Sequence, residues 1–158
     1  MGESTSYIVR TDAVPAKPFS GLARQATRDD LVPTLLASIG EAWDRIRAEG
    51  YANTGRNVAV YRDCTDGLIE FQAGVEILEG GMPPADELLW TPVGQAAWTV
   101  HTGDYGGLSQ AHGAILDWAK TNGVELAGPN WEIYGHWNED PAKLTTEVYY
   151  LVGPESGV

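Results

Sequence analysis

The segment Gly55-Arg-Asn-Val-Ala-Val-Tyr61 recurs 73 positions later as Gly128-Pro-Asn-Trp-Glu-Ile-Tyr134, with identical residues at the first, third and last positions. The similarity extends to both sides: residues 19–63 slide onto 92–136 without gaps, and nine residue pairs are then identical. Glycine or asparagine occupies five of these nine pairs, and both residues tolerate the positive φ angles that reverse a chain. The sequence therefore predicts an internal duplication.

Both copies contain the same order of predicted elements. A strand-like run at 19–26 or 95–102 leads into an amphipathic segment with apolar residues at helical spacing. Each predicted helix ends at a glycine, Gly50 in the first copy and Gly123 in the second. A hairpin of alternating residues follows each helix, at 57–63 with 68–77 and at 130–137 with 144–152.

Further strands are predicted at 7–14 and 87–91, one ahead of each copy. We therefore predict one α+β domain over residues 1–158, built as a duplicated ββαββ-type repeat at about 5–79 and 86–153, with a linker at about 80–85. Its antiparallel sheet would carry two main helices, with a ligand groove at the pseudo-twofold axis.

The composition argues against several classes of function. The 158 residues include 10 Lys and Arg against 22 Asp and Glu, a net charge of −12. Direct nucleic-acid binding is not expected, because it depends on clustered basic side chains. Cys64 is the only cysteine, which excludes an intramolecular disulfide and favours the reducing cytoplasm. No apolar run approaches the roughly 20 residues of a membrane span, so no membrane contact is expected.

The second copy contains a set of motifs in a characteristic order: Gly103-Asp-Tyr-Gly-Gly-Leu108, Trp118, Gly123, Gly128-Pro-Asn-Trp-Glu-Ile-Tyr134 and Thr146-Glu-Val-Tyr149. This set resembles GyrI-like proteins, the small-molecule-binding domain of gyrase-inhibitory-type proteins and of effector domains in AraC- and MerR-type multidrug-responsive regulators. The resemblance covers nearly the whole chain. Residues 1–158 leave no room for a DNA-reading helix-turn-helix, so a stand-alone form is expected.

The resemblance implies an eight-stranded antiparallel arrangement with two helices and a ligand groove between the copies. It also implies a hydrophobic, often cationic, aromatic ligand, anchored by a buried glutamate on the last strand, here Glu147. Some GyrI-like proteins hydrolyse cyclopropane-bearing genotoxins, so the resemblance leaves catalysis open.

Glu147 lies in an alternating run that places it on one strand face with Tyr149 and Leu151. A carboxylate in such an apolar setting has a raised pKa unless a cation or hydrogen-bond donors compensate. It would serve as a counter-charge for a cationic ligand or as a general acid or base. The alternative is an exposed glutamate on an edge strand.

Aromatic residues are concentrated in the second copy, where ring faces would attract flat cations; core packing is the competing interpretation of each. Trp131 shares a face with Ile133 and is predicted to pack, whereas the Tyr134 hydroxyl is expected near Glu132 and Glu147. The candidate ligand-binding residues are Trp90, Trp98, Tyr105, Glu132, Tyr134, Trp137, Glu147 and Tyr149, with Glu147 and Tyr134 as catalytic residues if the protein is an enzyme.

Neither a metal nor a cofactor is expected. The three histidines show no metal-ligand spacing, and His112 replaces Ile39 across the repeat, which predicts a histidine on a helix face. The glycine-rich turn at 103–107 lacks the spacing of dinucleotide and phosphate loops.

Binding of bulky hydrophobic, often cationic aromatic molecules, for sensing or sequestration, is the leading hypothesis for function. The first alternative is a hydrolase of strained electrophiles that uses Glu147 as general acid or base. The second is an acidic module that binds a DNA-handling protein.

Overall fold

The computed structural model describes residues 7–50, 54–78, 88–136 and 138–153. Its elements are β1 (Arg10–Val14), β2 (Pro18–Thr27), α1 (Leu31–Glu49), β3 (Thr54–Thr65), β4 (Leu68–Ile77), β5 (Leu88–Trp90), β6 (Gly94–Thr102), η2 (Tyr105–Gly107), α2 (Leu108–Asn122), β7 (Leu126–Tyr134), η3 (Pro141–Lys143) and β8 (Thr145–Val152). The expected linker at 80–85 and the candidate residue Trp137 lie outside the described residues.

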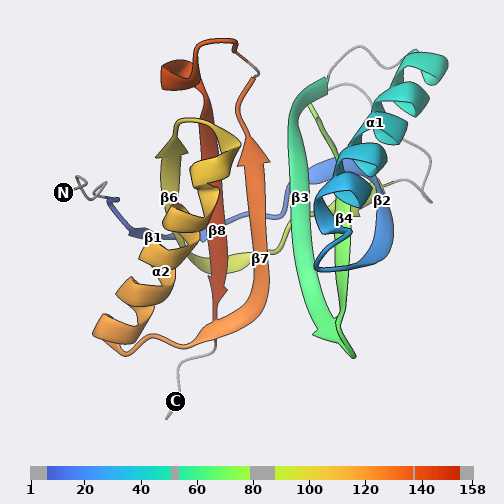
Figure 1. Cartoon of the computed structure of the whole chain (residues 1–158). Helices are drawn as coiled ribbons and strands as arrows, with labels where there is room; N and C mark the ends of the chain where they lie inside the picture. The colour runs from blue at the N-terminus through green and yellow to red at the C-terminus, as the bar shows by residue number, and fades with distance from the viewer. Residues whose placement is uncertain (1–6, 51–53, 79–87, 137, 154–158) are drawn as a thin grey trace.

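The eight strands of the described residues form one antiparallel sheet in the order β1-β6-β8-β7-β3-β4-β2-β5. The sheet curls into a half-barrel, and α1 and α2 lie over the same face of it (Figure 1). The predicted α+β class, with an antiparallel sheet and two main helices, is confirmed.

The first strand of each half is exchanged between the copies. β1 precedes the first copy but pairs with β6, and β5 precedes the second copy but pairs with β2. The sequence predicted both strands without this exchange. Each half thus supplies the edge strand of the other half of the sheet.

The two copies meet where β3 pairs with β7. Asn57 lies opposite Tyr134, and Tyr61 lies opposite Asn130. Since residues 73 positions apart are equivalent, the pseudo-twofold axis passes through the pair at the centre of this register, Ala59 and Glu132. The axis therefore carries a carboxylate in one copy and a methyl group in the other.

Both helices end as predicted, at Gly50 with φ 74° and at Gly123 with φ 65°. These left-handed angles explain the glycines. The hairpin strands differ at their ends from the expected ranges: β3 continues to Thr65, while β7 begins at Leu126 and stops at Tyr134. The two-residue loop Asp66-Gly67 has positive φ at both positions, which matches the right-handed twist of the strands.

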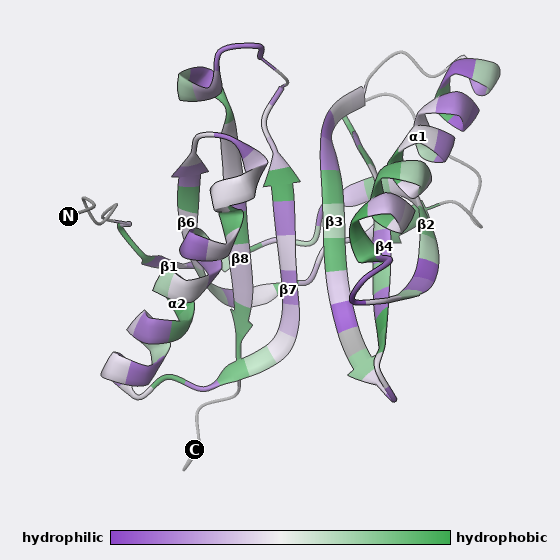
Figure 2. Ribbon diagram, in the orientation of Figure 1, coloured by the Kyte–Doolittle hydropathy of each residue, from purple (hydrophilic) through white to green (hydrophobic). Residues whose placement is uncertain are grey.

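The sheet has a buried cluster on each face. On the helix-covered face, α1 packs on Phe71 and Ala73, and α2 packs on Ala97 and Val148. The opposite face has its own core, made by Phe19, Val58, Val60, Ala96, Trp131, Ile133 and Tyr149. Hydrophilic residues occur among hydrophobic ones along β7 and β3 (Figure 2). One of them, Glu132 on β7, is buried. Within the described residues, neither helix is long and apolar enough to cross a membrane.

Candidate functional site

Glu132 lies on the helix-covered face of the sheet, at the pseudo-twofold axis. Strand alternation turns its neighbours Trp131 and Ile133 to the opposite face, where they join the core. Paired residues form one row across the sheet, Ala73, Ala59, Glu132 and Val148, and α1 and α2 pack on its two ends. Glu132 is 6% exposed, so this row contains a buried carboxylate between the two helices.

Three side chains donate hydrogen bonds to this carboxylate. The hydroxyls of Tyr61 and Tyr134 lie 3.0 and 2.5 Å from Oε1, and His112 Nε2 lies 2.7 Å from Oε2. Tyr61 and Tyr134 are equivalent positions of the repeat. The duplicated tyrosines thus converge on a carboxylate that only the second copy has.

Burial by itself raises the pKa of Glu132, but the hydrogen bonds from His112, Tyr134 and Tyr61 outweigh it and lower the pKa below its ordinary value. Burial also raises the pKa of Tyr61 and of Tyr134, and the Glu132 charge adds to the effect. At neutral pH the site therefore combines an ionised carboxylate with protonated tyrosine hydroxyls.

Two further aromatic side chains surround this group. The Tyr150 hydroxyl lies 2.7 Å from Nδ1 of His112. Tyr105, 44% exposed in η2, packs edge-on against Tyr134 with ring centroids 5.8 Å apart. We call Tyr61, Tyr105, His112, Glu132, Tyr134 and Tyr150 the axial site. Ring faces beside a buried anion are suited to an organic cation.

The structure brings three of the expected site residues together here, Glu132, Tyr134 and Tyr105. Sequence reasoning did not include Tyr61, His112 or Tyr150 among the site residues. Tyr61 could have been identified from its equivalence with Tyr134 in the repeat. His112 could have been identified because it is a polar residue where the first copy has the apolar Ile39.

Glu147 lies on the opposite face, paired in register with Ile133. It accepts hydrogen bonds from the Tyr149 hydroxyl at 2.6 Å and from Nη1 of Arg56 at 2.8 Å. The expected proximity of the Tyr134 hydroxyl to Glu147 is therefore wrong, because the strand pleat points the two side chains to opposite faces.

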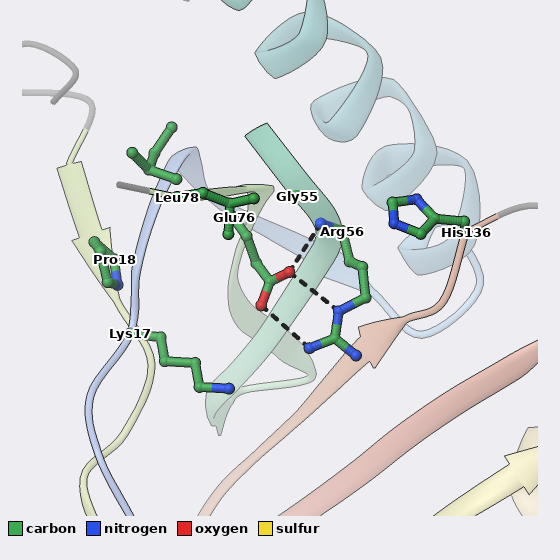
Figure 3. Close-up of a pocket in the computed structure, with 8 residues that line it drawn as sticks. Lys17, Pro18, Gly55, Arg56, Glu76, Leu78 and His136 are labelled. Atoms are coloured by element: carbon green, nitrogen blue, oxygen red, sulfur yellow. Dashed lines mark hydrogen bonds and ion pairs between the residues drawn. The ribbon is translucent and has the colours of Figure 1, made fainter. Parts of the chain in front are cut away.

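Arg56 also binds Glu76, through its backbone N–H at 2.8 Å and its Nε at 3.1 Å from Oε1 (Figure 3). Burial raises the pKa of Glu147, but Tyr149 and Arg56 outweigh it and the net shift is downward. Gly55 makes room for this arrangement, since a Cβ there would lie 2.7 Å from Oε1 of Glu76. Glu147 therefore already has a permanent cation beside it.

A cleft of about 380 Å³ opens beside this ion cluster (Figure 3). Its lining residues are Lys17, Pro18, Gly55, Arg56, Glu76, Ile77, Leu78 and His136.

The other expected aromatic contacts are not at the axial site. Trp98, Tyr149 and Trp131 form a stack on the opposite face, with centroid separations of 5.3 and 5.1 Å. Trp131 is 2% exposed, as its predicted packing role requires, and Nε1 of Trp98 donates to Asp12 at 2.7 Å. Trp90 is 45% exposed in the edge strand β5. Among the described residues, no group of three His, Cys, Asp or Glu side chains is placed to hold a metal ion.

Comparison with known proteins finds similarity in structure alone. No family model matches the sequence, and no curated protein matches it. The EcmrR C-terminal domain has a TM-score of 0.67 at 17% identity, with 96% of this chain and 100% of that domain covered. In the EcmrR–DNA complex, this chain spans 58% of the matched EcmrR chain.

Two other solved proteins match this chain over more than nine-tenths of their own length. SAV2435 bound to tetraphenylphosphonium has a TM-score of 0.57 at 14% identity, covering 94% of each chain. A hydrolase from Listeria innocua has a TM-score of 0.56 at 12% identity, covering 92% of this chain and 91% of that one. These neighbours are consistent with a GyrI-like fold.

Proposed function

We propose that this protein binds bulky hydrophobic cations at the axial site, with Glu132 as the counter-charge. One observation carries the proposal: Glu132 is 6% exposed and its bonded partners are two hydroxyls and an imidazole. None of these partners is a permanent cation. Glu147, by contrast, is paired with the guanidinium of Arg56.

The electrostatic reason is the cost of burying a charge. An ionised carboxylate removed from water is stabilised when a positive charge approaches it. Ring faces of Tyr61, Tyr134 and Tyr105 would add roughly 0.5–2 kcal/mol for each cation–π contact. Burial of the apolar body of the ligand would contribute about 25 cal/mol for each Å².

The structural neighbours support the ligand class. SAV2435, which shares the fold over 94% of this chain, has been solved with the hydrophobic cation tetraphenylphosphonium. Sensing or sequestration of such molecules is the role we infer, by analogy with a fold that also forms the C-terminal domain of EcmrR.

Tetraphenylphosphonium titrations, followed by tryptophan fluorescence, test the proposal. Trp43 packs in the cluster that includes Tyr61 and Tyr134, so it reports on this face. Glu132→Gln is expected to weaken tetraphenylphosphonium binding at least tenfold more than binding of neutral triphenylphosphine oxide. Glu147→Gln serves as the matched control and is expected to leave the ratio between the two ligands unchanged. Equal losses for both ligands in Glu132→Gln would refute the counter-charge role.

Hydrolysis of a strained electrophile is a second candidate function. The chain Tyr150–His112–Glu132, with both gaps at 2.7 Å, joins groups that transfer protons. A matched neighbour from Listeria innocua is described as a hydrolase. Glu147, expected as the catalytic base, would first have to leave Arg56. Catalytic turnover of a cyclopropane-bearing compound, lost in His112→Gln, would support this function; binding without turnover would refute it.

A further inference from the structure

His112 is the one imidazole of the axial site, and its Nε2 contacts the Glu132 carboxylate. Imidazole is the side-chain group that can gain or lose a proton in the physiological pH range. It lies on α2, and its side chain is 22% exposed. The equivalent residue in the first copy is Ile39, so this imidazole breaks the symmetry of the two helices as Glu132 breaks that of the strands.

Both ring nitrogens of His112 are engaged. Nε2 lies 2.7 Å from the Glu132 carboxylate, which can only accept, so Nε2 carries a hydrogen. Nδ1 lies 2.7 Å from the hydroxyl of Tyr150, which can either donate or accept. Tyr150 therefore satisfies the neutral ring by donating to Nδ1 and the imidazolium by accepting from it, with no heavy atom displaced.

The tyrosine hydroxyls of the axial site stay protonated, and therefore uncharged, near neutral pH. Tyr61 from β3 and Tyr134 from β7 have pKa values raised by burial, and burial raises the pKa of Tyr150 from β8 to about 12. The α1 side chains that pack in the cluster with Tyr61 and Tyr134 carry no charge. One of them, Trp43, donates a hydrogen bond to Asn57.

β6, which also packs against α2, places one further titratable group on this face, His101. It is 5% exposed, and its ring nitrogens lie 2.9 Å from the Tyr7 hydroxyl and 2.8 Å from the Asp104 backbone oxygen. On α2 the charged residues Asp117 and Lys120 are exposed, and η2 places the ring of Tyr105 against Tyr134. No lysine or arginine is bonded to Glu132 among the described contacts. The net charge of the axial site is therefore −1 with neutral His112 and zero with its imidazolium.

We propose that His112 sets the charge selectivity of the axial site by giving up its proton when an organic cation binds beside Glu132. This inference rests on the proposed function. The ligand charge and the imidazolium would compete for one carboxylate across a few ångströms, so each disfavours the other. Linkage then requires that cation affinity rise with pH through the imidazole titration, at most tenfold for each pH unit. A neutral ligand would show no such dependence.

Isothermal titration calorimetry of tetraphenylphosphonium between pH 5.5 and 8.5, at constant ionic strength, tests the inference. For the wild-type protein we expect affinity to rise with pH and then level off. Titrations in buffers of different ionisation enthalpy would show a proton released on binding at low pH and none at high pH.

Two variants assign the effect. His112→Gln keeps an N–H donor for Glu132 without a titration, and we expect its affinity to be independent of pH in this range. His136→Asn changes an exposed histidine beside the Arg56 cleft, on another part of the surface, and should keep the wild-type slope.

The outcomes separate the two proposals. If tetraphenylphosphonium binds equally at pH 5.5 and 8.5 without proton release, the role of His112 is refuted and the binding site stands. If His112→Gln retains the wild-type slope, another group titrates and the role is again refuted. Absence of binding at every pH would overturn the proposed function itself.

Discussion

Arg56→Met tests the structural role of the ion cluster that joins the two halves on the face opposite the axial site. The guanidinium on β3 bonds Glu76 on β4 and Glu147 on β8, reaching across β7. Methionine keeps most of the apolar stem but leaves two carboxylates without their cation. We expect the variant to fold with reduced stability.

The magnitude follows from the burial of the partners. Removing one member of a buried ion pair costs about 3–5 kcal/mol. Here Arg56 and Glu147 are each 26% exposed and Glu76 is 11% exposed, so solvent screens part of the loss. The Arg56 backbone N–H to Glu76 also survives the change. We expect a loss of about 2–3 kcal/mol, or roughly 4–12 °C in Tm for a chain of this length.

Urea unfolding as a function of pH is the assay. The depressed pKa of Glu147 means that its stabilisation is present above the unfolded value of 4.5 and is lost as the pH falls through the folded value. The difference in the free energy of unfolding between wild type and variant should therefore be largest near neutral pH and should become smaller toward pH 3. Arg47→Met, which removes an exposed pair with Asp44, is the control and should change stability by less than about 0.5 kcal/mol. The assigned role of Arg56 would be refuted if Arg56→Met lost as little stability as Arg47→Met. It would also be refuted if the difference in the free energy of unfolding from wild type did not depend on pH.

Three further substitutions have expected outcomes. Tyr134→Phe removes one of three donors to Glu132, so the carboxyl pKa should rise in a carbon-13 NMR titration; an unchanged midpoint would contradict the assigned bond. Gly40→Ala, in α1 with open space around its Cβ position, should stabilise the protein by about 0.5–1 kcal/mol in thermal unfolding. Gly55→Ala should instead destabilise it by about 1–3 kcal/mol, because the new Cβ meets Glu76; a neutral result would mean that the cluster gives way easily.

Local patterns made much of the fold predictable. Helix ends at Gly50 and Gly123 follow from the left-handed backbone that glycine permits, and the alternating runs identified both hairpins. The exchange of β1 and β5 between the copies was not predictable in this way. Nothing in a five- or three-residue strand specifies which of two similar edges it will pair with.

The site shows the same division. Alternation correctly placed Glu147 with Tyr149 and away from Tyr150, but it does not show which face the helices cover. The partner of Glu147 is Arg56. Arg56 lies where the pairing of β3 with β4 shifts register, between Thr54 and Asn57, and no sequence periodicity indicates this shift. Sequence reasoning therefore chose as anchor the carboxylate that already has a cation, and it named Glu132 only as a contact.

The proposed function depends most on where a hydrophobic cation binds, and a crystal structure of the tetraphenylphosphonium complex measures that position directly. We predict that the phosphonium lies between α1 and α2, within about 6 Å of an aromatic ring centroid of the axial site and facing the Glu132 carboxylate. A phosphonium seated instead in the cleft beside Arg56, with the axial site unchanged from the free protein, would contradict the account.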